Sequence, residues 1–174
     1  MSRRIVIDAS VARSAGVTEH PTSRCCREFL QEVIQICHRM VLTSELEREW
    51  KDHCSGFALQ WWGAMESRGK VARVRDLRDI RPNITSSAGS SSAKQAMLKD
   101  AHLITAAMAT DNVIASRDER AHELYAEIAS NVNGLGRVVW VPINEHDDDA
   151  LRWVKAGARA EIKFRLSQTA VARH

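Results

Sequence analysis

Ile5-Val-Ile-Asp8 stands near the start of the chain, a short apolar run that ends in an acidic residue. Such a run is typical of a strand that is buried on both faces, as in a parallel sheet. The acid would then lie at the carboxyl end of the strand, where the sheet meets solvent. Two later runs have a similar form, since Val113-Ile-Ala115 precedes Asp118 and Val138-Val-Trp-Val141 precedes Pro142.

Segments in which apolar residues recur at helical spacing separate these runs. The predicted helices cover residues 26–37, 44–57, 92–109, 119–129 and 149–166, and two further strands are predicted at residues 40–42 and 71–77. Short strands alternating with helices predict an α/β fold, a three-layer α/β/α sandwich around a central, mainly parallel sheet. We expect residues 1–174 to form one domain, completed by a strand and an amphipathic helix at about 137–168.

Several boundaries and orientations follow from local signals. Ser44-Glu-Leu-Glu47 and Ser92-Ala-Lys-Gln95 are capping boxes that open two of the helices. Residues 85–92 are small and polar, which predicts a mobile loop. Trp61 and Trp62 are adjacent, and core packing is the default expectation for them, with exposure of one for stacking or for a homodimer contact as the alternative.

The composition is that of an ordinary water-soluble domain, with 44% hydrophobic and 27% charged residues in 174. No apolar run is long enough to span a bilayer, and the basic start of the chain does not resemble a signal peptide. We therefore expect a cytoplasmic protein with no membrane partner. The four cysteines form no CxxC pair, which argues against a disulfide framework or a zinc knuckle.

The net charge of +3 is compatible with nucleic acid binding, and its distribution is more informative. Residues 66–81 contain six basic and three acidic residues, and residues 151–174 contain six basic residues and Glu161. For either stretch alone, a solvated face is the favoured explanation. Together, beside an acidic metal site, they would suit a protein that binds a phosphate backbone.

Three aspartates do not fit their surroundings. Asp8 and Asp118 each follow a strand, and Asp100 falls within the apolar stripe of a helix, between Met97 and Leu103. Simpler roles compete with a functional one: a turn at Asp8, a helix cap at Asp118, and a helix starting at Lys99 and capped by Asp100.

One glutamate joins them as a candidate. Glu49 borders the apolar face formed by Leu46, Trp50, His53 and Phe57. Glu47 belongs to the capping box, and Glu45 is a first-turn acid that favours the helix dipole. Glu49 is therefore the preferred inward-pointing acid, with Glu45 as the alternative.

Carboxylates that converge on one point repel each other, and a hard divalent cation relieves that repulsion. A bound cation can activate a water molecule and neutralise charge that develops on a phosphodiester. This combination favours hydrolysis of a phosphate ester over acyl transfer.

Four pieces of the sequence, in this order, resemble the PIN-domain ribonuclease family. They are Ile5-Val-Ile-Asp-Ala-Ser10, Leu42-Thr-Ser-Glu-Leu-Glu-Arg-Glu49-Trp, Lys99-Asp-Ala-His-Leu-Ile-Thr-Ala-Ala-Met-Ala109 and Val113-Ile-Ala-Ser-Arg-Asp118. The match spreads over residues 4–141, and the part from Asp100 to Asp118 is the most specific. The chain is longer than the compact toxins of this family, with a Ser-rich loop and a tail after Pro142.

The resemblance implies a central parallel sheet, Mg²⁺ or Mn²⁺ as cofactor, and endonucleolytic cleavage of RNA. It assigns Asp8, Glu49, Asp100 and Asp118 as metal-binding acids. It implies that Ser116 orients Asp118 or the attacking water, and that Ser10 supports the site from behind. Many prokaryotic members resemble toxins of toxin–antitoxin pairs, which would make an antitoxin protein a partner.

Two other functions compete with a ribonuclease. The same fold could serve as a non-catalytic module that binds RNA or another protein. A phosphotransfer hydrolase of the haloacid-dehalogenase type resembles Asp-x-Asp at the first strand, but here the triplet is Asp8-Ala-Ser10 and lacks the second acid.

Overall fold

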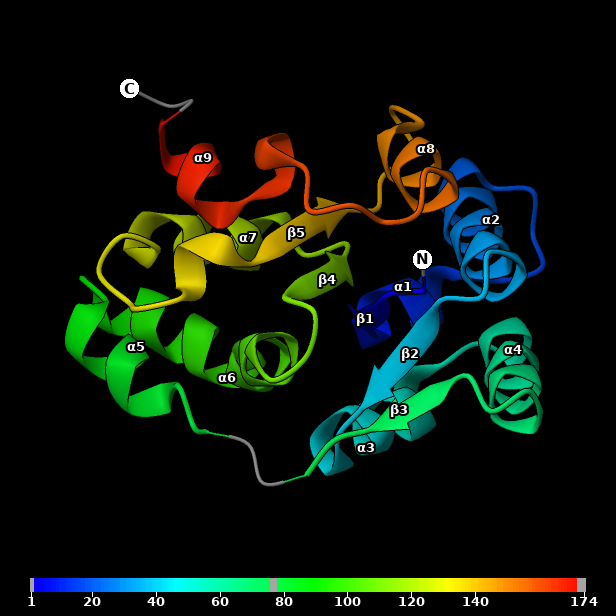
Figure 1. The fold of residues 1–174 in the computed structure, drawn as a ribbon, viewed down its shortest axis with the longest axis horizontal. Helices are drawn as coiled ribbons and strands as arrows, with labels where there is room; N and C mark the ends of the chain where they lie inside the picture. Colours follow the sequence, from blue (N-terminus) through cyan, green and yellow to red (C-terminus); the bar gives the residue numbers. More distant parts are fainter. Residues whose placement is uncertain (1, 76–77, 172–174) are drawn as a thin grey trace.

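The structure is a computed structural model, and it describes residues 2–75 and 78–171 (Figure 1). Its centre is a sheet of five parallel strands in the order β3-β2-β1-β4-β5. The strands are β1 (Arg4–Ile7), β2 (Arg39–Leu42), β3 (Val71–Arg73), β4 (Val113–Ser116) and β5 (Val139–Pro142). The predicted α/β/α sandwich with a parallel sheet is confirmed.

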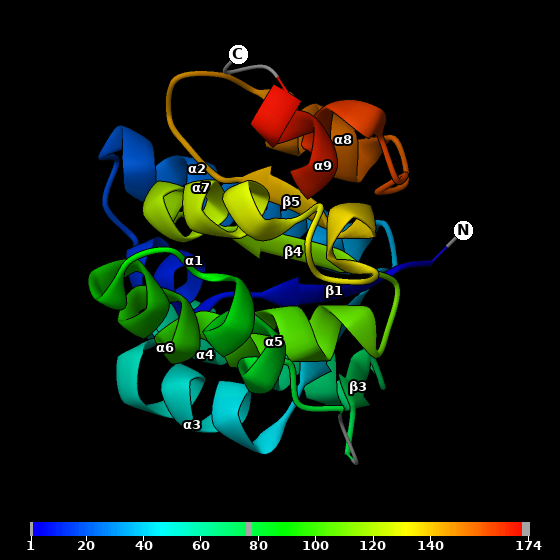
Figure 2. The same ribbon diagram turned by 90° about the vertical axis from the view of Figure 1, so that its left-hand side faces the viewer.

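Helices cover both faces of this sheet. They are α1 (Ala9–Ser14), α2 (Pro21–Gln35), α3 (Ser44–His53), α4 (Gly56–Ser67), α5 (Arg81–Ser87), α6 (Ser91–Met108), α7 (Glu119–Ile128), α8 (Asp149–Lys155) and α9 (Leu166–Val171), with 3-10 turns η1 (Leu135–Arg137) and η2 (Ile162–Phe164). One layer contains α2 and α4 with α8 packed on α2, and the opposite layer contains α5, α6 and α7 (Figure 1). Figure 2 looks onto this second layer. Among the described residues, no helix is long and apolar enough to cross a membrane.

The strand order creates a crevice at the centre of the sheet. From β1 the chain moves outward to β2 and β3, and it then returns across the opposite face to β4 on the other side of β1. Ligand sites in open parallel sheets lie at the carboxyl ends of the strands where the order reverses in this way. Here that point lies between β1 and β4, which pair through Val6–Ile114 and Ile7–Ala115.

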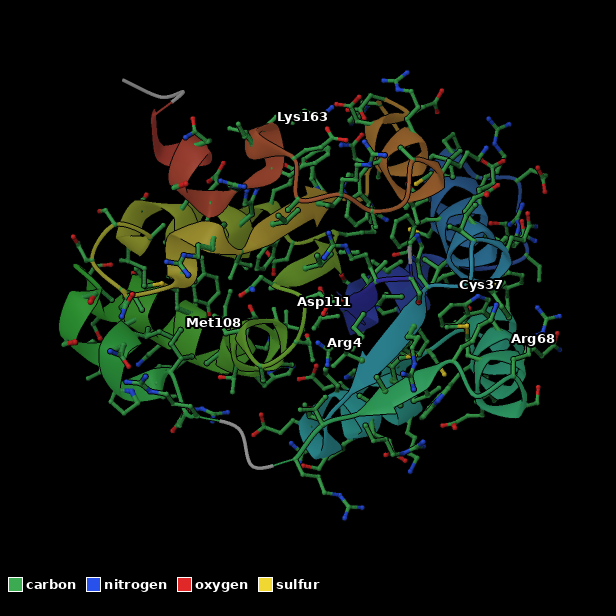
Figure 3. The ribbon with its side chains drawn as sticks, viewed as in Figure 1. Arg4, Cys37, Arg68, Met108, Asp111 and Lys163 are labelled. Carbon is green, nitrogen blue, oxygen red and sulfur yellow. The ribbon has the colours of Figure 1, made fainter. Side chains whose placement is uncertain are left out.

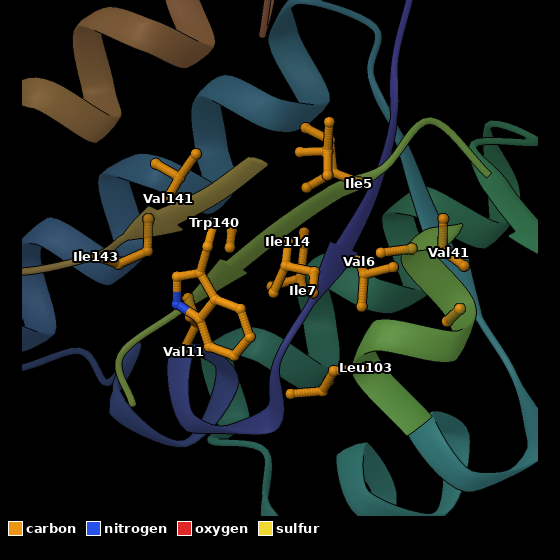
Figure 4. Close-up of a cluster of buried hydrophobic side chains, with 14 of the residues drawn as sticks. Ile5, Val6, Ile7, Val11, Val41, Leu103, Ile114, Trp140, Val141 and Ile143 are labelled. Carbon is orange, nitrogen blue, oxygen red and sulfur yellow. The ribbon is translucent and has the colours of Figure 1, made fainter. Parts of the chain in front are cut away.

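The core explains why the strands are continuously apolar. Ile5, Val6 and Ile7 are fully buried because helices cover both faces of β1, and Ile114 and Trp140 continue the core into β4 and β5 (Figure 4). The middle of the sheet is therefore a rigid support for the residues that follow β1 and β4.

Both members of the tryptophan pair pack into the core. Trp61 and Trp62 are only 5% and 7% exposed, which confirms the default expectation and excludes the alternative that one of them faces solvent. The Trp61 indole N–H donates to the Leu30 carbonyl, and that of Trp62 donates to Glu66. Both rings can be buried because α4 lies between neighbouring elements and each indole N–H finds an acceptor.

The last predicted helix, residues 149–166, is interrupted in the structure. Helix α8 ends at Lys155, and Gly157 and Ala158 then take φ angles of +92° and +53°. This left-handed backbone cannot continue a right-handed helix. The chain then continues through η2 to α9. The apolar spacing that predicted one helix over residues 149–166 is therefore divided among short separate elements.

Other helix boundaries also need correction. The side chains that cap α3 and α6 belong to Thr43 and Ser90, one and two residues before the predicted Ser44 and Ser92. The predicted loop at 85–92 is mostly helical, because α5 runs to Ser87 and α6 begins at Ser91. The helix expected over residues 44–57 is divided into α3 and α4, with Ser55 capping α4.

Candidate functional site

Asp8 directly follows β1 and caps the short helix α1. Its carboxylate accepts hydrogen bonds from the backbone N–H and the hydroxyl of Ser10, and from the hydroxyl of Ser116 at 2.6 Å. Both serines donate hydrogen bonds to the Asp8 carboxylate itself. The side chain is half-buried and held in one orientation at the carboxyl end of the central strand.

Ser116 connects the ends of two strands. It is the last residue of β4 and is 1% exposed. Its hydroxyl donates to Asp8 and accepts from the backbone N–H of Asp118 at 3.0 Å. One buried hydroxyl therefore ties Asp8 to the segment that carries Asp118, across the crevice between β1 and β4.

Asp118 caps helix α7, as the alternative interpretation of this residue proposed. One carboxylate oxygen accepts from the backbone N–H of Ala121 at 2.8 Å. The residue as a whole is exposed. Capping and a role in the site are compatible, because a carboxylate has a second oxygen and further lone pairs.

Asp100 lies in the interior of α6, which runs from Ser91 to Met108, so the alternative of a helix that starts at Lys99 is wrong. Its carboxyl group is half-buried, and its pKa is raised to about 6. Burial is the largest cause, and the negative charges of Asp8 and Asp118 follow. The three aspartates, which come from separate segments, therefore lie close enough to repel one another.

Glu49 is placed differently from these three. Its carboxylate contacts the imidazole Nε2 of His102 at 2.9 Å, and it is not among the main charges that act on Asp100. The alternative acid, Glu45, binds the guanidinium of Arg81 through both oxygens. Glu47 pairs with Lys51 and lies near Arg73. Of the three glutamates, Glu49 is thus the one that contacts α6, the helix that carries Asp100.

His102 is absent from the sequence-based set of candidates. It is 4% exposed, between Ala101 and Leu103 on the buried face of α6, and its positive form lowers the pKa of Asp100. The signal that could have found it is a histidine two residues after Asp100, in an otherwise apolar stretch of helix.

The donor chemistry of the three aspartates suits a hard divalent cation. Among residues 2–75 and 78–171, no group of three or more His, Cys, Asp or Glu side chains is already arranged to hold a metal ion. Burial and the charges of Asp8 and Asp118 disfavour the ionised form of Asp100 and raise its pKa to about 6, and a nearby cation would favour that ionised form. Carboxylate oxygens are the ligands that Mg²⁺ and Mn²⁺ prefer.

A pocket of about 520 Å³ opens at the carboxyl ends of β2 and β3. His102 and Thr105 belong to its wall, and so do Arg73, Arg75 and Arg81 from the first basic stretch, whereas the four candidate acids do not line it. A second hollow, of about 390 Å³, is lined by Ser10, Arg13, Ser14, Arg117, Asp118 and Glu119. Cationic side chains thus line both the hollow that contains Asp118 and the pocket that contains His102. Asp76, another member of the first stretch, lies outside the described residues.

The second basic stretch lies elsewhere, which corrects the prediction that both stretches flank the site. The Val154 carbonyl contacts buried His38, just before β2 begins, and Arg165 forms a bridge with Val139, the first residue of β5. These contacts lie at the amino ends of the strands. Lys163 pairs with Asp149 on this part of the molecule (Figure 3). Arg173 lies outside the described residues.

Comparison of the chain with protein-family models, with curated proteins and with solved structures found no match.

Proposed function

We propose that this protein is a metal-dependent endoribonuclease that hydrolyses the phosphodiester bonds of RNA. The observation that carries the proposal is the arrangement around Ser116, whose buried hydroxyl joins Asp8 to the Asp118 segment while both charges act on Asp100. Three acids from separate segments, gathered at the reversal point of a parallel sheet, support a catalytic site better than a purely structural one.

Asp8, Asp100 and Asp118 would hold Mg²⁺ or Mn²⁺, with Glu49 as the fourth acid of the site. When bound, the cation supplies a Lewis acid that favours ionisation of water and offsets charge on the phosphate. The protein's own residues keep the carboxylates in place. Ser10 and Ser116 fix Asp8, and the N-terminus of α7 fixes one oxygen of Asp118.

RNA as the substrate is supported by the cations beside the acids. Arg13 and Arg75 are exposed and form no ion pair with any residue that the structure describes. Arg13 lines the hollow that contains Asp118, and Arg75 lines the pocket that contains His102, so a phosphate backbone that extends from one to the other would meet a cation in each. A cytoplasmic location, an antitoxin protein and a homodimer are further parts of this proposal.

The test is cleavage of single-stranded and structured RNA by the purified protein, with Mn²⁺ or Mg²⁺ and with EDTA. We expect cleavage only with the cation, and a loss of several orders of magnitude in Asp8→Asn and in Asp100→Asn. Asp52→Asn is the matched control, because Asp52 is exposed on α3 and away from the site's hydrogen bonds.

Two results would contradict the proposal. Full cleavage in EDTA, or by both site variants, would exclude metal-dependent hydrolysis at these aspartates. Mn²⁺ binding without cleavage of any RNA would instead favour the non-catalytic module that binds RNA or protein.

A further inference from the structure

His102 and Glu49 form a partly buried contact between two helices that lie far apart in the sequence. His102 is on α6 and Glu49 is on α3, and 2.9 Å separates Nε2 of the ring from Oε2 of the carboxylate. The histidine side chain is 5% exposed, whereas that of Glu49 is 32% exposed. The buried partner is therefore the histidine, and the glutamate is the partner that remains partly open to solvent.

The chemistry of the two groups fixes the direction of this hydrogen bond. An ionised carboxylate can only accept, so the imidazole must carry its proton on Nε2 and donate it. A buried ring nitrogen without a partner would be costly, which explains why this contact is maintained inside an apolar helix face. The bond also restricts Glu49, whose long side chain would otherwise populate several rotamers.

The position of the pair relates it to the acidic site. His102 lies on the same helix as Asp100 and is among the groups whose charge acts on the Asp100 carboxyl group, and it also lines the 520 Å³ pocket. Glu45 and Glu47, the other acids at this end of α3, are held by Arg81 and Lys51 instead. Only Glu49 is directed to the helix that carries Asp100.

We infer that His102 is a positioning residue that holds Glu49 in place as the fourth acid of the site. This role rests on the proposed function and adds a residue to it. Histidine here acts through Glu49, much as hydrogen-bonding partners behind metal ligands orient those ligands and strengthen metal binding.

The experiment measures Mn²⁺ affinity by isothermal titration calorimetry, which does not depend on cleavage. His102→Leu removes the donor and keeps an apolar side chain, and we expect it to weaken Mn²⁺ binding about tenfold or more. His102→Gln places an amide N–H near the position of Nε2, so it should restore most of the affinity. His53→Leu is the control, because His53 is an exposed histidine on the same helix as Glu49.

A double variant separates positioning from a merely structural effect. Glu49→Gln should weaken Mn²⁺ binding as much as His102→Leu, and the combination should be no weaker than Glu49→Gln alone. Additive losses, or unchanged affinity in His102→Leu with normal binding by wild type, would overturn the positioning role and leave the proposed function standing. A wild-type protein that binds no Mn²⁺ would overturn both.

Discussion

Asp100 lies where its charged form is disfavoured, because it is half-buried on α6 and faces the charges of Asp8 and Asp118. Its pKa rises from 3.8 to about 6 in the folded protein. Between these two values the folded state binds a proton that the unfolded chain has released. The stabilisation that this proton provides is present at low pH, and it is lost as the pH rises through about 6.

Replacing this carboxyl group should therefore stabilise the metal-free protein at neutral pH. In EDTA at pH 7, we expect Asp100→Asn to raise the free energy of unfolding by roughly 1–3 kcal/mol. The advantage should shrink toward pH 4, where the wild-type carboxyl group is protonated. Urea denaturation at both pH values measures this, with Asp52→Asn as the control. A stability gain of equal size at pH 4 and pH 7 would show that the ionised carboxylate of Asp100 is not the source of the gain.

At the scale of single elements, backbone conformation makes the clearest prediction. Gly157 lies two residues after the end of α8 and has a φ of +92°. A Cβ added there would meet nothing within 4 Å. Gly157→Ala should thus cost about 1–2 kcal/mol through backbone strain alone. Gly63 is exposed within α4 and also has open space, so Gly63→Ala should instead stabilise by about 0.5–1 kcal/mol.

Thermal and urea denaturation of the two alanine variants, compared with wild type, provide the measurement. Both glycines have open space for a Cβ, so the two variants differ in the backbone conformation at the substituted residue and not in crowding. Equal effects of the same sign would mean that the break after α8 does not depend on a left-handed glycine.

The elements also show what could be predicted and what could not. The continuous apolar run Ile5-Val-Ile was enough to predict a buried strand. The position of Asp100 within an apolar helical stripe was enough to identify it as a candidate site residue. Local patterns could not locate the break at Gly157, because the amphipathic spacing continues past it. They also could not join Glu49 to His102, since that contact depends on how α3 meets α6.

At the scale of the whole molecule, the distribution of cations separates the two basic stretches. Arg13 lines the hollow that contains Asp118 and Arg75 lines the pocket that contains His102, whereas Arg159 and Lys163 belong to the segment near the amino ends of the strands. We therefore expect Arg13 and Arg75 to contact RNA, and not Arg159 and Lys163 of the second basic stretch.

We expect the double variant Arg13→Gln, Arg75→Gln to bind RNA more weakly. The slope of log affinity against log salt concentration should fall by the equivalent of about one to two phosphate contacts. The matched double variant, Arg159→Gln with Lys163→Gln, should behave as wild type. Binding is measured by fluorescence anisotropy in EDTA over a range of salt concentrations, so that the RNA stays intact. A reduced slope in the second pair alone would place the RNA on the opposite edge of the sheet.

The outer edge of β5 is largely closed to an additional strand. The bridge between Val139 and Arg165, and the hydrogen bond from the Leu166 N–H to the Val138 carbonyl, occupy the beginning of that edge. Pro142 at its end has no N–H to donate. On the other side of the sheet, β3 offers only three residues. Neither margin is a good template for edge-to-edge aggregation, so two copies of this chain would associate through their helices and not through a continuous sheet.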